Sequence, residues 1–373
     1  MSKNIQHIES VVEEIYFESD AAIYKHIGRN QIDSETVALT EIVKNSYDAD
    51  ATEVRIYFDN PDKTNGEIIV TDNGTGMSPE EFKQFWMRPA TSHKESEPRS
   101  KIFRRTMLGR KGMGRFGTDK IASVVVVKSK TRDDQMAFSA RIDGDKFDQP
   151  GAKFEKTPVE FRPLHKDGLK FVLQDFSSGT EIRMKNLRTK WSKSMIREIR
   201  EELSSMISPI KQATEFNITI EVKGDPELSG RLENKIATGY THEMIVQVDR
   251  HDTYSITLDG KVLRTGNVID DCEEILTNTA EDTISSDIAP IEPKSFGPLT
   301  SRVVYFKEGG LIKHNTAKHG KRVDHSGVKI YRSGFRVLPY GEKTDDWLRI
   351  KTKRASRGGK YYLHPEKIAG VIS

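Results

Sequence analysis

Cysteine is nearly absent from the chain, with Cys272 the one cysteine among 373 residues. Disulfides within the chain and a metal site built from clustered cysteines are therefore excluded. Apolar runs of membrane-spanning length are lacking too, and the first twenty residues carry acidic side chains where a signal peptide needs an unbroken apolar core. These absences predict a soluble, cytosolic protein with no membrane partner.

A strong charge imbalance is also missing, because the formal net charge is only +3. The hydrophobic fraction of 35% supports a folded chain, although 31% of the residues are charged. The overall charge gives no reason to expect nucleic-acid binding, which leaves only local basic patches to consider. The length exceeds what one compact core usually holds, so two domains are expected.

The periodicity along the chain mixes helical and strand patterns, which predicts an α+β fold. Helices are predicted at "SETVALTEIVKNSYDAD", with Ser34 as N-cap, and at "KWSKSMIREIREELSSMISPI". Strands are predicted before the second helix at "EVRIYFD", "EIIVTD", "IASVVVVKSK", "QMAFSARID", "GLKFVL" and "GTEIRMKNL", and after it at "FNITIEVKG", "TYSITLDGKVL", "RVVYFKEGG" and "GVKIYRSGFRVLPYG". The chain stops in a strand-like run, "KIAGVIS", which suggests a portion of a longer polypeptide.

The first helix carries polar residues beside its apolar stripe. Glu41, Asn45 and Asp48 are separated by four and three residues, so they share one helical face. For any one of them alone, a solvated helix face is the simpler interpretation.

The segment "VTDNGTGM" is an apolar strand that runs into a glycine turn. Such a strand end places the Asp72 carboxylate where it could accept a hydrogen bond from an exocyclic amine such as that of adenine, and the glycines let backbone approach a ligand. "DNG" alone is equally typical of a hairpin turn, but the second glycine, Met77 and the helix start at Ser78 favour the first interpretation.

The segment "LGRKGMGRFG" is rich in glycine and contains a GxGxxG match. A basic loop precedes it instead of a strand, and no βαβ unit follows, so the dinucleotide-binding interpretation fails. A kinase-type glycine loop fails because "HRD" and "DFG" are missing downstream. The remaining interpretation is a set of backbone N–H groups before a helix, beside Lys111 and Arg115, which suits polyphosphate binding.

These segments occur in a fixed order, and Gly179–Thr180 opens a later strand. The constellation resembles the GHKL superfamily of gyrase B subunits, heat-shock-90 chaperones, histidine kinases and MutL proteins, best over residues 30–190. "GPLTSRVVYF" and "GVKIYRSGFRVLPYGE", with "DWL" after them, are similar to the second domain of the MORC-like and bacterial heat-shock-90-like branch. The resemblance implies a Bergerat-type α/β sandwich and a transducer-like α/β domain.

The resemblance also implies how the chain is divided. We expect an N-terminal arm at 1–30, a GHKL ATP-binding domain at 31–190 and a linker helix at 191–212. A transducer-like domain at 213–373, incomplete at its C-terminus, would follow.

The resemblance gives the helix and the strand end roles in binding ATP with Mg²⁺. Glu41 would be the general base that activates the attacking water, and Asn45 would ligate Mg²⁺. Asp48 would support the base of the pocket. Asp72 would bind the adenine amine.

Further residues would complete the nucleotide pocket. A water held by Thr180 would assist in binding the adenine amine. Gly74 and Gly76 would let the nucleotide approach, and Met77 would pack beside the base.

The lid implied by the resemblance spans Thr91–Gly117. Its expected nucleotide contacts are Lys94, Gly109, Lys111, Gly112, Met113, Gly114, Arg115, Phe116 and Gly117. From the second domain, Lys351, Lys353 or Arg354 would reach the γ-phosphate; the choice stays open, and a solvated basic loop is the simpler interpretation for each.

Within the superfamily, hydrolysis is favoured over phosphotransfer to histidine. A histidine kinase needs a phosphoacceptor on a helical hairpin before the ATP domain, and the upstream histidines are only His7 and His26. We therefore expect an ATPase that releases ADP and phosphate and forms a homodimer through its N-terminal arm.

Three interpretations of its biological role stay open. It could be an ATP-gated clamp on DNA or RNA, which the basic runs "RPATSHKESEPRSKIFRR" and "RIKTKRASRGGK" mildly favour. It could be a chaperone acting on protein clients. It could be an ATP-switched scaffold with partner proteins in a multi-protein system such as antiphage defence.

Overall fold

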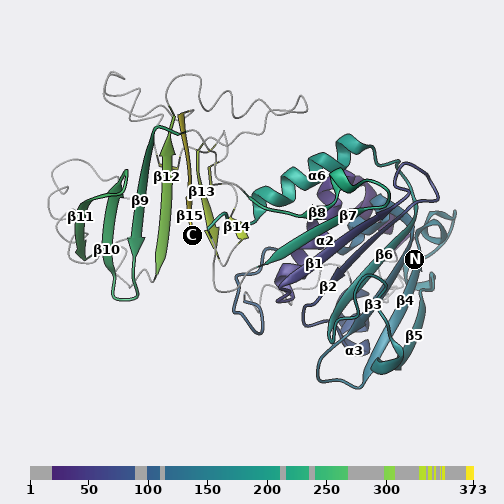
Figure 1. Cartoon of the computed structure of the whole chain (residues 1–373). Coiled ribbons are helices and arrows are strands. Elements are labelled where there is room, and N and C mark those ends of the chain that lie inside the picture. The colour runs from purple at the N-terminus through teal and green to yellow at the C-terminus, as the bar shows by residue number, and fades with distance from the viewer. Residues whose placement is uncertain are drawn as a thin grey trace, which may run out of the picture.

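The computed structural model describes residues 19–88, 99–109, 114–210, 216–234, 240–267, 298–306, 327–332, 335–337, 340–341, 345, 347–348 and 367–373. Their strands form two mixed sheets, and the two longest helices pack against the first sheet (Figure 1). The α+β class predicted from the sequence is confirmed. None of the helices in the described ranges is both long and apolar enough to cross a membrane.

The first sheet has the order β5-β4-β3-β6-β2-β1-β7-β8. Its strands are β1 Glu53–Asp59, β2 Glu67–Asp72, β3 Ala122–Lys130, β4 Met136–Asp143, β5 Glu160–His165, β6 Gly179–Leu187, β7 Asn217–Val222 and β8 Gly230–Arg231. Neighbours are antiparallel except β1 and β7, which are parallel. This pairing carries the first sheet past residue 213, where the sequence suggested that the second domain begins.

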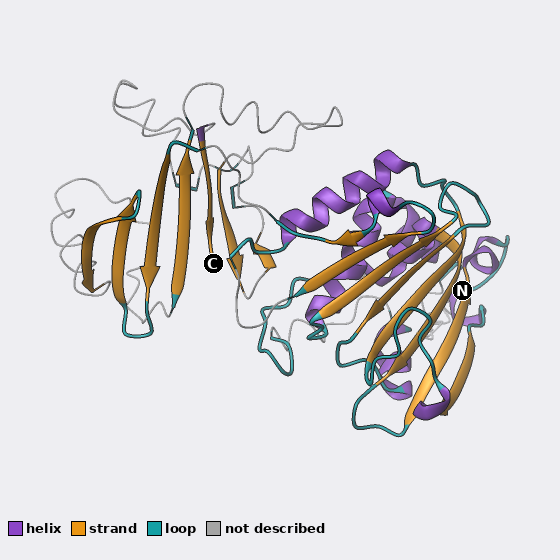
Figure 2. Ribbon diagram, in the orientation of Figure 1, coloured by secondary structure: helices purple, strands orange, loops and turns teal. Residues whose placement is uncertain are grey.

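The helical elements are short apart from α2 and α6. They are α1 Ile23–Lys25, η1 His26–Asn30, α2 Glu35–Asp48, α3 Pro79–Glu81, η2 Phe82–Trp86, η3 Gly114–Gly117, α5 Thr118–Ile121, η4 Gly144–Asp148, η5 Phe154–Lys156, η6 Lys166–Gly168, α6 Lys193–Met206 and η7 Pro226–Leu228. Ser34 caps α2 as predicted, because its Oγ accepts from the Val37 amide at 3.2 Å. Both long helices cover one face of the first sheet (Figure 2).

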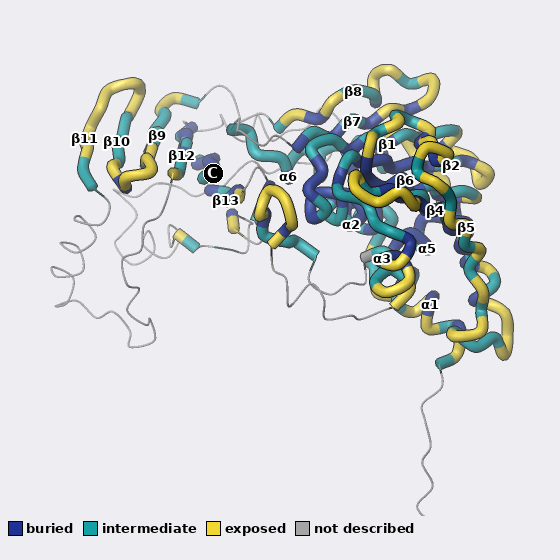
Figure 3. The backbone as a smooth tube through the Cα atoms, turned by 90° about the horizontal axis from the view of Figure 1, so that it is seen from below, coloured by how far each residue is buried: buried dark blue, intermediate teal, exposed yellow. Residues whose placement is uncertain are grey.

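The main core lies between that face and the two helices. β1 alternates half-buried and buried residues, so that Val54, Ile56 and Phe58 point into the core. Leu39 of α2 and Leu203 of α6 are completely buried in the same cluster. Figure 3 shows this concentration of buried backbone around α2 and the first sheet.

One predicted strand is wrong. "GLKFVL" at 168–173 follows the η6 turn as irregular chain, and Leu169 and Phe171 pack in a small cluster with Ala137 of β4. The strand is instead β5, which lies at the sheet edge with mostly exposed residues and with Pro163 inside it. Its sequence lacks the alternation that identifies a half-buried strand, and an edge strand tolerates proline.

The second sheet has the order β11-β10-β9-β12-β15-β13-β14. Its strands are β9 His242–Val248, β10 Thr253–Leu258, β11 Lys261–Asn267, β12 Leu299–Tyr305, β13 Gly327–Arg332, β14 Phe335–Val337 and β15 Ile368–Ile372. The run "KIAGVIS", expected to leave an odd edge, forms interior strand β15, which pairs antiparallel with β12 and parallel with β13. The second sheet has a small core of its own, formed by Val304, Phe306 and Ala369.

Candidate nucleotide-binding site

Helix α2 presents a polar face that a ligand can reach. Ile42 and Val43 are buried in the core, whereas Glu41, Lys44 and Asn45 are half-buried. Lys44 Nζ donates to Glu41 Oε1 at 2.7 Å, an (i, i+3) ion pair on the helix surface. The amphipathic pattern therefore leaves a carboxylate, an ammonium and an amide together at the edge of the core.

The Asp72 carboxylate lies at the end of β2, beside α2, and is only 7% exposed. Its Oδ2 accepts from Ser46 Oγ at 2.9 Å, and its Oδ1 accepts from the amides of Gly74 at 2.9 Å and Thr180 at 3.3 Å. Burial raises the pKa of Asp72, while these three hydrogen bonds oppose the rise. The carboxylate is thus held in a fixed orientation.

This arrangement fits an adenine amine. Two carboxylate oxygens offer about four acceptor positions, and three are used by Ser46, Gly74 and Thr180. One acceptor position of Asp72 is therefore left for a donor from a ligand. A buried acceptor of this kind discriminates strongly for a group that donates a hydrogen bond.

A second hydrogen-bonded pair lies beside it, on β3 and β6. Ser129 Oγ donates to the carbonyl of Gly179 at 2.9 Å, accepts from the Met77 amide at 2.8 Å and lies 2.9 Å from Thr180 Oγ1. Because a hydroxyl has one proton, Thr180 donates to Ser129 and keeps acceptor capacity. Ser129 therefore ties Met77 and Thr180 to each other.

The glycines of "DNGTGM" have a reason within the fold itself. A Cβ on Gly74 would lie 2.6 Å from the carbonyl oxygen of Ala49, and Gly76, with φ of +70°, would bring one 2.1 Å from that of Lys130. Gly179 has φ of +135° and meets the backbone of Asp72 in the same way. Close approach of backbone to backbone, rather than to a ligand alone, requires these residues.

Asp48 belongs to the end of α2 and holds the chain that leads into the glycine-rich segment. Its two carboxylate oxygens accept from the amides of Leu108 at 2.7 Å and Gly109 at 3.0 Å. Asp50 does the same for Ile102 and Phe103, at 2.7 and 3.1 Å. The third polar position of the helix motif thus lies against residues 99–109.

The described end of the glycine-rich segment, η3, packs on α2. A Cβ on Gly117 would lie 2.7 Å from the Ile32 Cδ1 atom and 3.4 Å from the Ala38 Cβ, so η3 lies close to α2 at this position. Phe116 is buried, and the Arg115 guanidinium lies 5.3 Å from its ring. Burial lowers the pKa of Arg115 to about 10.

Several candidate residues lie outside the described ranges. These are Lys94, Lys111, Gly112, Met113, Lys351, Lys353 and Arg354. Of Gly114 only its place at the start of η3 is described.

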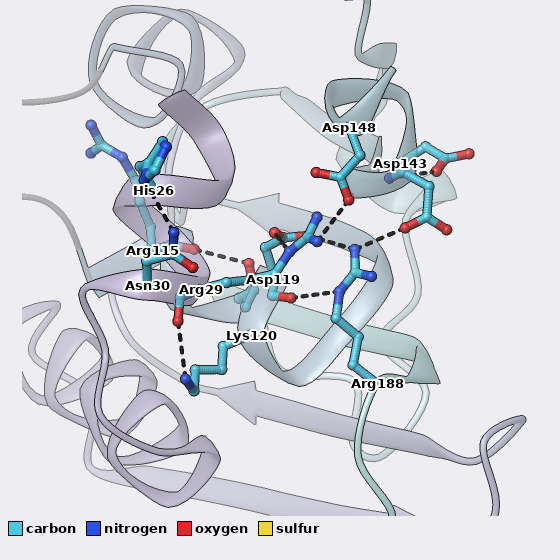
Figure 4. Close-up of polar contacts among 11 residues, drawn as sticks. His26, Arg29, Asn30, Arg115, Asp119, Lys120, Asp143, Asp148 and Arg188 are labelled. Carbon is cyan, nitrogen blue, oxygen red and sulfur yellow. Dashed lines mark hydrogen bonds and ion pairs between the residues drawn. The ribbon is translucent and has the colours of Figure 1, made fainter. Parts of the chain in front are cut away.

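The described part of the expected N-terminal arm, residues 19–30, lies on the first sheet's own domain (Figure 4). Arg29 of η1 pairs with Asp119 of α5 at 2.5 Å and with Asp148 at 2.7 Å, and Arg188 reaches Asp119 at 3.0 Å. Lys120 Nζ donates to the Arg29 carbonyl. The arm is therefore fastened to the helix that follows the glycine-rich segment.

A cavity of about 250 Å³ lies near the same segment but apart from Asp72. Its lining residues are Tyr24, Trp86, Met87, Arg115, Phe116, Ile142, Phe147, Phe154, Glu155, Thr157 and Val159. Glu41, Asn45, Asp72 and Thr180 do not line it, so this cavity is separate from the Asp72 carboxylate.

The sequence reasoning missed Ser46 and Ser129. Ser46 follows Asn45 directly and could have been found, because a buried strand-end carboxylate needs donors from the adjacent helix. Ser129 carried no such signal, since it reaches Met77 and Thr180 only through the pairing of β3 with β6.

Within the described ranges, groups of three or more His, Cys, Asp or Glu side chains that could hold a metal are not found. Mg²⁺ at a nucleotide does not require such a group, because it is commonly held by one or two protein ligands together with phosphate oxygens and water. The half-buried Asn45 amide is compatible with that pattern.

A family model described as "Histidine kinase-, DNA gyrase B-, and HSP90-like ATPase" matches residues 32–180. The match covers α2, the Asp72 turn, the glycine-rich segment and Thr180 in the order observed. This part of the chain belongs to the GHKL ATPase superfamily. The family implies that the domain binds ATP. The two-sheet α+β architecture of the chain agrees with a GHKL domain followed by a second domain.

The putative type II restriction enzyme HgiDII of Herpetosiphon aurantiacus is a relative of the chain. It is 31% identical to the chain over 153 residues, which are 40% of the chain and 24% of the relative. The chain thus spans about a quarter of the length of that relative.

Proposed function

We propose that this chain is a Mg²⁺-dependent ATPase whose nucleotide cycle drives lid closure and dimerisation of a molecular clamp. The observation that carries the proposal is the Asp72 carboxylate, buried and held by Ser46, Gly74 and Thr180, beside the helix that bears Glu41 and Asn45. That arrangement places an acceptor for adenine, at the end of β2, beside a candidate base and a candidate metal ligand that both lie on α2.

Glu41 is the proposed general base. Water attacks the γ-phosphorus, the bond from that phosphorus to the β–γ bridging oxygen breaks, and Glu41 accepts the proton of the water. The observed ion pair uses Oε1 of Glu41, so Oε2 is the oxygen that would take the proton. Bound Mg²⁺, held by Asn45 and phosphate oxygens, would neutralise the charge that develops on the phosphates.

The clamp part of the proposal concerns the lid and the arm. Residues 99–109 and η3 flank the centre of the glycine-rich segment, and both are fastened to α2. We expect nucleotide binding to couple lid closure to dimerisation, and turnover to be slow because closure limits the rate. The arm that would contribute to the dimer is residues 1–30.

The client we favour is nucleic acid, within a multi-protein system such as antiphage defence. The support is the similarity to a putative restriction enzyme, together with the basic runs in the sequence. A heat-shock-90-like chaperone acting on protein clients and an ATP-switched scaffold are the alternatives.

The experiment that tests the proposal compares ATP turnover and ATP affinity in the wild-type chain and in Glu41→Ala. We expect the variant to bind ATP and lose turnover, by roughly a hundredfold or more as for other general bases. Glu160→Ala, at an exposed position on edge strand β5, is the matched control and should keep both properties. Unchanged turnover in Glu41→Ala would refute the assignment of the base.

A second arm of the experiment adds double-stranded DNA. Stimulated turnover favours the nucleic-acid clamp, whereas stimulation by an unfolded protein alone favours the chaperone. ATP binding without any turnover in the wild-type chain favours the scaffold.

A further inference from the structure

Arg105 is a completely buried cation at the end of the helix of the proposed active site. Its Nη1 donates to the carbonyls of Tyr47 at 3.2 Å and Ala51 at 2.6 Å. Tyr47 lies in the last turn of α2, where its carbonyl also accepts from the Asp50 amide at 3.1 Å, and Ala51 follows the helix end. The C-terminal end of a helix concentrates negative partial charge, which favours a cation there. The guanidinium therefore caps the helix that carries Glu41 and Asn45.

The same arginine belongs to a short hairpin-like segment, residues 99–109. Its amide donates to Ser100 Oγ at 2.8 Å, its carbonyl accepts from the Ser100 amide at 2.8 Å, and Arg99 bridges Thr106. Asp48 and Asp50 hold four other amides of the segment. The end of α2 and the chain entering the glycine-rich segment are thus joined on both sides of the arginine.

Aromatic rings extend this contact to the second sheet. The Arg105 guanidinium lies 4.6 Å from the Tyr47 ring and 5.8 Å from the Phe216 ring. Phe335 of β14 lies 4.7 Å from Tyr47 and 5.9 Å from Phe216. Although Phe335 belongs to the second sheet, it is buried in the core of the first.

The contact is reinforced by hydrogen bonds from neighbouring tyrosines. Tyr47 Oη donates to the Arg332 carbonyl at 3.2 Å, and Tyr331 Oη donates to the Ser205 carbonyl of α6 at 2.9 Å. Strands β13 and β14 therefore rest on the ends of both long helices. Figure 1 shows β14 at this junction between the two sheets.

We propose that Arg105 is a positioning residue that fixes the entry to the glycine-rich segment on the end of α2 and joins both to β14 of the second sheet. Nε and Nη2 of Arg105 are buried without a hydrogen-bond partner among the described residues. An apolar side chain would fill this space without that cost, so packing alone does not explain the arginine. A buried charge with unused donors costs free energy, whereas its one satisfied nitrogen sets where two backbone segments meet. For turnover, this inference rests on the ATPase function proposed above.

Hydrogen exchange measured by mass spectrometry on the full chain tests the proposal without any need for turnover. In Arg105→Met, amides of residues 99–109 should exchange roughly tenfold faster or more. Loss of the hydrogen bonds from the charged guanidinium should raise the opening equilibrium of the segment by about that factor. Strands β2 and β6 should keep their protection. Arg200→Met is the control, because Arg200 is part-buried and, like Arg105, donates to a backbone carbonyl, that of Leu228 at 2.7 Å, away from this segment.

Phe335→Leu tests the link to the second sheet. It keeps an apolar side chain but loses the ring contacts with Tyr47 and Phe216, and exchange in residues 99–109 should again rise. An unchanged rate in that segment for either variant would overturn the proposal, as would an equal rise in Arg200→Met.

Nucleotide turnover supplies a separate readout. Arg105→Met should lower the rate of ATP turnover more than the affinity for ATP, and Arg105→Lys should restore part of the rate because it keeps a cation at the helix end. If Arg105→Met does not fold, Arg105→Lys and Phe335→Leu decide the question by exchange. A wild-type chain without turnover would refute the proposed ATPase and leave the exchange test of Arg105 intact.

Discussion

Strands β1 and β2 of the first sheet are better buried than strands β9, β10 and β11 of the second. In the first, β1 buries every second residue and β2 buries all but its first. In the second, β9, β10 and β11 contain half-buried and exposed residues and no buried residue. Figure 3 shows the same contrast along the backbone.

The reason for the difference is what covers each face. Helices α2 and α6 pack on one face of the first sheet, and the loop with Leu169 and Phe171 packs under β4 on another part of it. Such a sheet can hold side chains in fixed positions, which is what a binding site requires. The second sheet relies on a small core of its own and on Phe335, which is inserted into the core of the first.

The largest expected effect is on protein stability, and comparing one substitution near each sheet tests this contrast. Leu203→Ala on α6, at a completely buried position, should destabilise the protein by about 2–5 kcal/mol. Leu263→Ala on β11, where the side chain is 62% exposed, should change stability by no more than about 0.5 kcal/mol. Urea denaturation followed by fluorescence measures both, and equal losses would show that the two regions are similarly packed.

A smaller effect is expected at the binding site of the better-buried sheet. Asp72→Asn should keep the fold and weaken ATP binding roughly tenfold or more, because the amide replaces an acceptor of a charge-assisted hydrogen bond. Isothermal titration calorimetry measures the affinity, and Asp62→Asn in an exposed turn is the control. Wild-type affinity in Asp72→Asn would mean that the carboxylate does not contact the base.

The smallest effect concerns an ion pair at the margin of the first sheet. Asp175 accepts from Lys130 and Lys170, each at 2.8 Å, and these lysines lower the pKa of Asp175 to about 2. Because the folded pKa lies below the unfolded value of about 3.9, its stabilisation is present above about pH 4 and is lost as the pH falls towards 2.

Asp175→Asn should therefore cost less than about 1 kcal/mol at pH 7, since the side chain is 37% exposed and solvent screens the pair. The difference from wild type should shrink on acidification, which thermal melts between pH 7 and pH 3 can follow. Asp133→Asn, an exposed position in the neighbouring turn, serves as control. A difference that grows towards low pH would contradict a lowered pKa of Asp175 in the folded protein.

The sequence predicted the elements with a strong period or cap. Helix α2 with its Ser34 cap and the alternating strand β1 follow from local physics and are confirmed. Strand β5 was missed because an edge strand with exposed residues and Pro163 has no such period. The placement of β15 inside its sheet could not be foreseen either, because strand order depends on distant pairing.

The candidate site divides in the same way. The spacing of Glu41, Asn45 and Asp48 on one helix determined their common face, and the order of motifs determined the superfamily. Only the tertiary structure decided that Asp48 faces the chain at Leu108 and Gly109, that Ser46 holds Asp72, and that Phe335 joins the core beside Arg105. Local spacing is set by the 3.6-residue turn of one helix, whereas contacts between segments far apart in sequence depend on which buried groups the whole fold brings together.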